Sequence, residues 1–535
     1  MQSPVLAPAP PQPTASPTRR RTPPVPLITT CATLPLYGIW ATLLATGGGD
    51  LAAQYAWAGF AARHPGTPYA LFWYAGTHTA NYSVLSPPLM ALLGVRTISV
   101  LSGVAATWLL SALLTRTLVR SPLWPSLLGA LGVWTNVASG RTTFALGLAF
   151  GLAALLAVAD RAHLKTAALA ASLATLASPV AGLFLLVAAA GYGLNRRYAK
   201  SLALALPPVL LVASTTLLFP FEGEQPMSAI RLALPLLMSA VVAWAAPREW
   251  RVVRAGAGVY AIGAVLTWLI PSPVGMNVER LALHFAPTVL LAALLHTSRR
   301  RTVALSAALA VSVHWCVLPT ALDLRVTTPV PAWAGHTTGV RTELTRLGAT
   351  RARIEVPPAR DHREAILFAP HIQQMRGWNR QLDVERGRLF YDDHLDASRY
   401  RAWLHHWAIT YVVLPRAAPE PHSVAESALI PRARKWLRPV WHDADWQIYR
   451  VTDPTPLATP PAQVLRADEA VVHLKLPRAA TITVRVAYSP WLRAEGACVR
   501  ERAGWTELTA PRAGVYRLTS SYVRVLDGQP ACRQP

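Results

Sequence analysis

Asp50 is the residue whose chemical type and position most suggest catalysis. It follows Gly47, Gly48 and Gly49 at the end of the first long apolar run of the chain. Glycines let a backbone turn sharply and approach a ligand closely, and a carboxylate held there can accept the proton of a bound hydroxyl group. Asp50 is therefore our candidate general base. The alternative is that Asp50 caps a helix over residues 51–63, with its side chain on free N–H groups.

Three arginines are candidates for binding a phosphate group. Arg141, Arg231 and Arg280 lie in short segments between later apolar runs. A charge at membrane depth costs roughly 2.5 to 3.5 kcal/mol, so such a residue tends to find a partner or to line a cavity. A guanidinium can grip a phosphate with two hydrogen bonds. We expect this role for Arg141 and Arg280, and less for Arg231.

Asn277 and Glu279 stand beside Arg280, and we count both as candidate substrate contacts. The alternative for this group is an ion pair or a snorkelling arginine.

Aromatic and polar side chains gather at the far end of the loop that begins with Asp50. Trp73, His78 and Tyr82 are our candidates for contact with a sugar. The same residue types form the aromatic belt at a membrane interface, so both interpretations stay open. Glu222 and Glu224 could assist a metal or a substrate, or simply be solvated. We predict no cofactor and no metal site, although a divalent metal is possible.

The composition is typical of a polytopic membrane protein. Of 535 residues, 52% are hydrophobic and only 15% are charged, whereas a soluble globular protein has about 25% charged residues. The net charge of +24 does not indicate a nucleic-acid partner, because the basic residues form short clusters between apolar runs. The chain has no Walker or Rossmann glycine pattern, which argues against an enzyme that uses ATP or a dinucleotide.

The apolar runs predict about eleven transmembrane helices between residues 27 and 318. They cover residues 27–46, 98–115, 122–138, 143–159, 166–178, 180–194, 201–219, 230–246, 255–270, 281–297 and 303–318. The run 166–178 would rise only about 20 Å as a helix, against a hydrocarbon core of about 30 Å. The alternative is that 166–178 and 180–194 form a re-entrant hairpin, which leaves nine spans.

The distribution of Lys and Arg predicts the orientation in the plasma membrane. Alternate junctions hold sixteen Lys or Arg on one side and five on the other, and the richer side is cytoplasmic by the positive-inside rule. The tail 1–26 is then disordered and cytoplasmic. The first long loop, residues 47–97, and everything after the last span are extracytoplasmic.

The composition becomes polar after the last span and predicts an exported domain. We expect a Pro- and Thr-rich linker at 319–340, an α/β subdomain at 341–455 and a β-rich subdomain at 456–535. In an exported domain, a disulfide between Cys498 and Cys532 is plausible. Three stretches are dense in Arg, Asp, His and aromatic residues, at 360–365, 376–383 and 388–396. They face the membrane site or form ion pairs inside a polar fold.

The chain resembles the GT-C superfamily of membrane glycosyltransferases. The resemblance is carried by Asp50 just outside the first span, the amphipathic segment 51–63, about eleven spans and an exported domain. More closely, the stretches SGRTTFALGLAFGLAALLA (139–157), VGMNVERL (274–281), RGWNRQLD (376–383) and YRAWLHHWAITYVVLP (400–415) resemble a group of bacterial multispanning proteins with no assigned reaction.

The resemblance implies transfer of a sugar, with inversion, from a polyprenyl-phosphate-linked donor to an envelope glycan, lipid or protein acceptor. Asp50 would be the general base, and Arg141 and Arg280 would hold the lipid phosphate. Many GT-C proteins show two neighbouring acids in the first loop, whereas Asp50 stands alone in this loop. This departure leaves both metal dependence and activity open.

Two other functions fit the same sequence. A transporter or flippase is one, but no Asp, Glu, Lys or Arg lies in the interior of a predicted span, where ion-coupled transporters commonly carry them. The other is a non-catalytic scaffold for envelope assembly, in which Asp50 would be only a helix cap.

Overall fold

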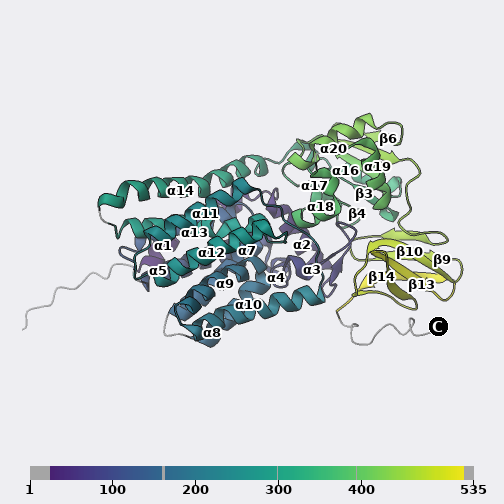
Figure 1. Cartoon of the computed structure of the whole chain (residues 1–535). Coiled ribbons are helices and arrows are strands. Elements are labelled where there is room, and N and C mark those ends of the chain that lie inside the picture. Colours follow the sequence, from purple (N-terminus) through teal and green to yellow (C-terminus); the bar gives the residue numbers. More distant parts are fainter. Residues whose placement is uncertain (1–23, 118, 160–162, 298, 393, 523–535) are drawn as a thin grey trace, which may run out of the picture.

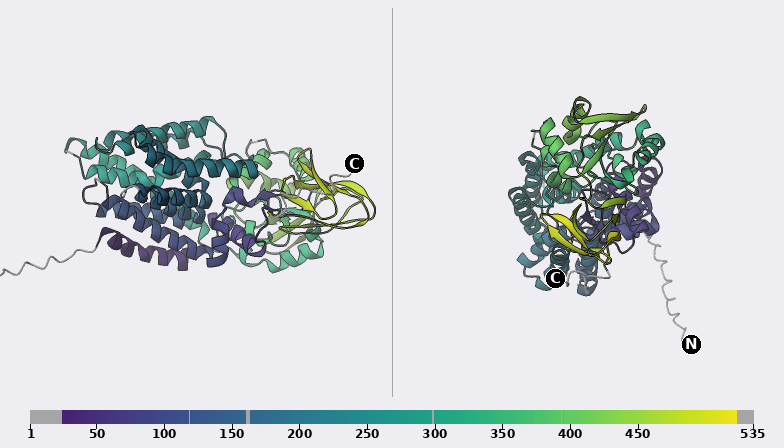
Figure 2. Two further views of the ribbon diagram at one scale, coloured as in Figure 1. Left: turned by 90° about the horizontal axis from the view of Figure 1, so that it is seen from below. Right: turned by 90° about the vertical axis from the view of Figure 1, so that its right-hand side faces the viewer.

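The protein consists of a long helical domain with a C-terminal domain attached at one end (Figures 1 and 2). The structure, a computed structural model, describes residues 24–522 except 118, 160–162, 298 and 393. Most of the predicted tail 1–26 and Cys532 lie outside the described residues. Cys498 is disulfide-bonded.

One helix forms in each of the eleven predicted spans, because these runs are rich in Ala and Leu, which favour helices, and a helix satisfies its own backbone in lipid. They are α1 (Val25–Ile39), continued by the π-helical turn η1 (Trp40–Leu44), α5 (Val95–Thr115), α6 (Leu123–Ala138), α7 (Thr142–Ala159), α8 (Leu164–Ala177), α9 (Pro179–Leu194), α10 (Tyr198–Leu218), α11 (Ala229–Ala245), α12 (Arg251–Leu269), α13 (Glu279–Leu294) and α14 (Arg299–Thr327).

Six of these helices in the described part of the chain are long and apolar enough to cross a membrane, namely α1 with η1, α5, α7, α10, α12 and α14. The protein is thus a polytopic helical membrane protein, and the number of eleven spans stays a prediction. The turn between α8 and α9 reaches the loop that carries Asp50, where the Ser83 and Ser86 hydroxyls donate to the carbonyl oxygen of Ala177 at 2.9 Å each. This contact favours a full crossing by α8 and α9 over a shallow hairpin.

The last helix of the bundle extends further than the apolar run indicates. α14 continues to Thr327 and carries Pro319 in its interior, so the predicted linker at 319–340 begins inside a helix. The residues after Pro319 include Ala321, Leu322 and Leu324, which favour helix and continue it beyond the proline. The short helix α15 (Ala332–Gly335) and then α16 (Thr338–Arg346) follow.

The first long loop is folded and lies between the two domains (Figure 1). It contains α2 (Asp50–Arg63), β1 (Tyr69–Ala70), β2 (Thr77–His78), α3 (Thr79–Tyr82) and α4 (Ser86–Leu93). An amphipathic segment with aromatic residues suits a membrane interface, but in α2 the side chains of Trp57 and Phe60 are each only 1% exposed. α2 packs instead on α4 and on α17 (Glu364–Leu367) of the C-terminal domain, so its aromatic side chains fill a protein core.

The C-terminal domain begins with a mixed sheet in the strand order β4-β3-β5-β7-β6. β3 is parallel to β4 and β5, whereas β7 runs antiparallel to β5 and β6. The strands are β3 (Arg353–Glu355), β4 (Gln373–Gln374), β5 (Ile409–Pro415), β6 (Leu437–His442) and β7 (Trp446–Val451), and the helices beside them are α16, α17, α18 (Arg380–Arg386), α19 (Ala397–His406) and α20 (Val424–Leu429).

Two antiparallel sheets follow, in the orders β10-β13-β12 and β11-β14-β9-β8. The strands are β8 (Gln463–Ala467), β9 (Val472–Leu476), β10 (Ala480–Ala487), β11 (Leu492–Ala494), β12 (Cys498–Arg502), β13 (Trp505–Ala510) and β14 (Gly514–Ser520). Tyr69 and Leu71 from the first loop are buried in the core between these sheets. The first loop is therefore anchored in the C-terminal domain as well as in the helical bundle.

Candidate active site

The backbone of the three glycines before Asp50 passes close to the end of α14. Gly47 and Gly49 have φ of +96° and +64°, a region that favours glycine. A Cβ atom on Gly48 would lie 2.8 Å from the carbonyl oxygen of Thr327, and one on Gly49 would lie 2.7 Å from its methyl group. The N–H of Gly49 donates to the carbonyl oxygen of Asp361 at 2.6 Å. Asp50 thus begins α2 at the junction of the two domains.

The carboxylate of Asp50 bonds to two side chains from distant parts of the chain. Arg141 Nε donates to Oδ2 at 3.1 Å, and Trp378 Nε1 donates to Oδ1 at 3.0 Å. The N-cap residue of α2 is Gly49, and no side-chain hydrogen bond caps this helix in the structure. Asp50 is thus the first helical residue, where the helix dipole favours its charge, but its carboxylate is directed to side chains rather than to the helix N–H groups.

Arg141 reaches Asp50 because the turn between α6 and α7 packs on the start of α2. Gly140 in this turn has a φ of +76°, and a Cβ atom there would lie 2.8 Å from the backbone nitrogen of Leu51. The side chains of Arg141 and Asp50 are 24% and 30% exposed, so solvent or a ligand can still reach the pair.

Arg280 lies beside this pair. It is in the first turn of α13, partly buried, with its guanidinium 5.3 Å from the centre of the Phe144 ring. It is close enough to Asp50 and Arg141 to interact with their charges. In the described part of the chain, no carboxylate oxygen lies within 4.0 Å of this guanidinium. Its hydrogen-bonding capacity is therefore available to an anion.

The neighbours of Arg280 have other partners. Glu279 Oε1 lies 3.7 Å from Arg231 Nη1, so the ion pair that the sequence left open forms with Arg231. Asn277 lies in the 3-10 turn η2 (Gly275–Val278), two residues before Glu279, and is partly buried.

Of the three candidates from the first loop, Tyr82 lies close to Asp50, whereas Trp73 and His78 are packed in the protein interior. Tyr82 stacks on Trp57 with ring centres 5.2 Å apart, and burial together with the charge of Asp50 raises the pKa of its hydroxyl. Trp73 is fully buried and donates to the carbonyl oxygen of Ala365 at 3.0 Å.

His78 is also part of the packing rather than of the site around Asp50. It is buried, and its Nε2 lies 2.9 Å from Ser489 Oγ. Burial lowers the pKa of His78 to about 4, so the ring is neutral at physiological pH.

Three residues at the site were not among the sequence candidates. Trp378 lies in the stretch 376–383, one of those dense in charged and aromatic residues. His362, from 360–365, stacks on Trp378 with ring centres 3.5 Å apart. Asp323 on α14 is close enough to Asp50, Arg141 and His362 to interact with their charges. Asp50 therefore has an acidic neighbour in space, although it has none in its own loop.

Within the described residues, no group of three or more His, Cys, Asp or Glu is arranged to hold a metal ion. Glu224 contacts Arg388 of the C-terminal domain at 3.4 Å, and its side chain is 30% exposed, whereas that of Arg388 is 65% exposed.

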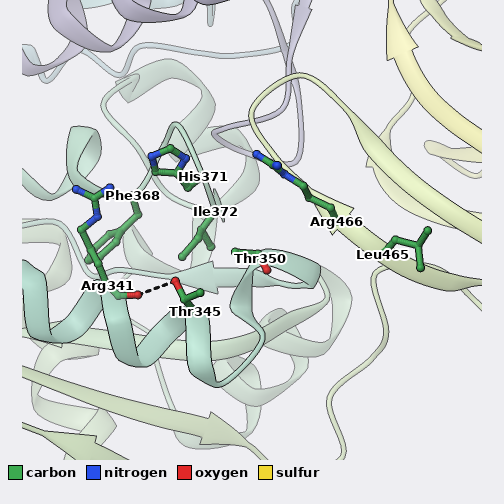
Figure 3. Close-up of a pocket in the computed structure, with 8 residues that line it drawn as sticks. All are labelled: Arg341, Thr345, Thr350, Phe368, His371, Ile372, Leu465 and Arg466. Carbon is green, nitrogen blue, oxygen red and sulfur yellow. Dashed lines mark hydrogen bonds between the residues drawn. The ribbon is translucent and has the colours of Figure 1, made fainter.

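One cavity of the C-terminal domain is distinct from the site at Asp50. It has a volume of about 320 Å³ and lies between α16, the turn after α17 and β8 (Figure 3). Its lining includes Arg341, His371 and Arg466 together with Phe368 and Ile372. None of these residues contacts Asp50, Arg141 or Trp378, so the cavity is separate from the site at Asp50.

Comparison with known proteins gives limited similarity. No curated protein matches the sequence. A domain of unknown function (DUF8823) matches residues 459–502, in the β-rich part of the chain. Among solved structures, the arabinofuranosyltransferase AftD from Mycobacteria is similar with 15% identity and a TM-score of 0.44, over 85% of this chain and 41% of AftD. ArnT from Cupriavidus metallidurans in the apo state is similar with 13% identity and a TM-score of 0.36, over 79% of this chain and 97% of ArnT.

This chain spans about two fifths of the length of AftD. Both similarities have TM-scores below 0.5 and identities of 15% or less, so the chemistry of this chain is inferred from the residues around Asp50.

Proposed function

We propose that this protein is a membrane glycosyltransferase. It transfers a sugar from a polyprenyl-phosphate-linked donor to an extracytoplasmic acceptor of the cell envelope, with Asp50 as general base. The observation that carries the proposal is the pairing of Asp50 with Arg141, 3.1 Å apart, beside an Arg280 that has no carboxylate partner among the described residues. A base and an anion-binding group are thus neighbours at one end of the helical bundle.

The reaction would be a single displacement with inversion. Asp50 accepts the proton of the acceptor hydroxyl, whose oxygen then bonds to the anomeric carbon of the donor sugar. The bond from that carbon to the phosphate oxygen breaks, and its electron pair leaves with the polyprenyl phosphate. A positioned general base typically contributes about 10²- to 10⁴-fold to such a step.

The two arginines would stabilise the charge that develops on the leaving phosphate. Arg141 already holds Asp50, so it can touch the phosphate only with the guanidinium nitrogens that this bond leaves free. Arg280 can offer its whole fork, which suits a phosphate in two-point hydrogen bonding. We therefore assign the larger part of donor binding to Arg280. Tyr82, with its hydroxyl near both Asp50 and Arg280, lies where the sugar would be held.

A complementation experiment tests the proposal. A host lacking this protein is supplied with the wild type, Asp50→Asn or Asp392→Asn, and the envelope glycans and lipids are compared by mass spectrometry at equal protein level. We expect the wild type to restore a missing glycan and Asp50→Asn to fail. Asp392→Asn is the matched control and should retain activity, because Asp392 is also a half-buried carboxylate paired with an arginine, Arg399 at 2.6 Å, but lies outside the site. An active Asp50→Asn protein would contradict the proposal.

A further inference from the structure

Trp378 is the contact between the C-terminal domain and Asp50. It lies 328 residues from Asp50 in the sequence, and its indole N–H donates to Oδ1 of the carboxylate at 3.0 Å. Arg141, from the helical domain, occupies the other oxygen. The carboxylate is thus held at both oxygens by two groups from two different domains.

The indole of Trp378 is itself fixed by two neighbours. The His362 ring lies against it with ring centres 3.5 Å apart and planes inclined by only 14°. The guanidinium of Arg380 lies 5.1 Å from the centre of the Trp378 ring, within the range of a cation–π interaction. Rotation of the indole away from Asp50 would break both contacts.

The backbone on either side of Trp378 is anchored in the core of the C-terminal domain. Arg376 is 1% exposed and donates to both oxygens of Asp383, at 2.8 Å each, and to Glu426 at 2.7 Å. Gly377 passes so close to the Trp73 ring that a Cβ atom would lie 2.2 Å from it. The Tyr74 hydroxyl donates to the carbonyl oxygen of Gly377 at 2.8 Å.

We propose that Trp378 is a positioning residue of the active site, so that the C-terminal domain completes the site rather than only covering it. This inference rests on the proposed function of Asp50. A fixed donor holds a carboxylate in one orientation, and a general base works only when its oxygen points at the proton that it accepts. The N–H of Trp378 therefore orients Asp50, and its loss should slow the transfer step without abolishing it.

The test compares two tryptophans that bridge the same two domains. Trp378→Phe keeps an aromatic ring against His362 but removes the N–H donor. Trp491→Phe is the matched control, because Trp491 Nε1 donates to the carbonyl oxygen of Leu218 at 2.8 Å and does not contact Asp50. For both variants, kcat and KM of sugar transfer are measured separately at the same pH.

We expect Trp378→Phe to lower kcat by about 10- to 100-fold, the equivalent of one hydrogen bond to a charged group, and to change KM by less than about threefold. Trp491→Phe should leave both constants within about threefold. A loss of packing between the domains alone would change both variants alike. An unchanged kcat in Trp378→Phe, or an equal loss in both variants, would overturn the proposal.

A second measurement does not depend on transfer activity. 5-Fluorotryptophan is placed at position 378 of the full chain, and its ¹⁹F chemical shift is compared in the wild type, Asp50→Asn and Asp392→Asn. We expect Asp50→Asn to move the resonance, because it removes the charged acceptor of the indole N–H, and Asp392→Asn to leave it in place. If the resonance moves in this way but no variant transfers sugar, the contact stands and the proposed function fails. If Asp50→Asn leaves the resonance unchanged, the positioning role is refuted.

Discussion

Arg280→Gln separates binding of the lipid phosphate from folding of the protein. The substitution removes a guanidinium that has no ion-pair partner in the described part of the chain. It leaves no buried carboxylate unpaired, so the large cost of breaking a buried ion pair does not arise. The lost contact with the Phe144 ring costs about 0.5 to 2 kcal/mol. The protein should therefore fold, with a modestly lower melting temperature.

The expected effect on binding follows from the chemistry of the guanidinium. Each hydrogen bond to a charged group contributes about 1.5 to 3 kcal/mol, and Gln replaces two such bonds by at most one neutral one. We expect a net loss of about 2 to 4 kcal/mol, which is roughly a 30- to 1,000-fold weaker binding. Arg280→Lys keeps the charge but loses the two-point geometry, so its loss should be intermediate.

The assay is the binding of undecaprenyl phosphate to the purified full chain in nanodiscs, together with thermal unfolding. Arg231→Gln is the matched control, because this arginine is 54% exposed and lies opposite Glu279 at 3.7 Å. Its substitution should leave the affinity within about threefold. An unchanged affinity in Arg280→Gln, or an equal loss in Arg231→Gln, would refute the assignment of the phosphate site.

Two further predictions concern stability. Arg376→Met leaves the buried carboxylates of Asp383 and Glu426 without their shared cation. It should lower the apparent free energy of unfolding, measured by denaturant titration, by about 3 to 5 kcal/mol. A decrease of less than about 1 kcal/mol would contradict the prediction that these carboxylates depend on Arg376. The pKa of His78, lowered by burial from 6.5 to about 4, means that the unfolded chain binds a proton at pH 5 that the folded chain does not. Stability is therefore lost as the pH falls from about 6.5 to 4, by up to about 3 kcal/mol. His78→Gln should flatten this slope relative to the wild type, and parallel slopes would count against it.

The helical domain follows closely from the sequence because lipid imposes a simple rule on it. A chain in hydrocarbon must satisfy its backbone within each segment, so long apolar runs become helices, and α1 and α5 to α14 formed where these runs lie. The end of α14 did not follow, because the proline-containing composition after residue 318 indicates a break, whereas Pro319 is accommodated inside the helix. The position of α2 did not follow from the sequence either, because its aromatic residues suit a membrane interface but are buried between the two domains.

The site could be predicted only in part. Asp50, Arg141 and Arg280 were identified because charge is scarce near membrane spans, and the structure brings these three together. Residue type alone did not separate Tyr82, whose hydroxyl is influenced by the charge of Asp50, from Trp73 and His78, which pack in the interior.

The contact of Trp378 with Asp50 joins residues 328 positions apart. It depends on how the C-terminal domain docks on the bundle, and no local pattern encodes that docking. Only the density of charged and aromatic residues in 376–383 hinted at it.

The central claim is that Asp50 is the base in transfer of a sugar from a polyprenyl-phosphate donor. Its most direct test is the release of polyprenyl phosphate from polyprenyl-phosphate-linked sugars, measured by mass spectrometry with the full chain in nanodiscs and envelope extract as acceptor. We predict release by the wild type and a rate about 10²- to 10⁴-fold lower for Asp50→Asn, with the variant still binding undecaprenyl phosphate. Equal rates for the two proteins would contradict the claim.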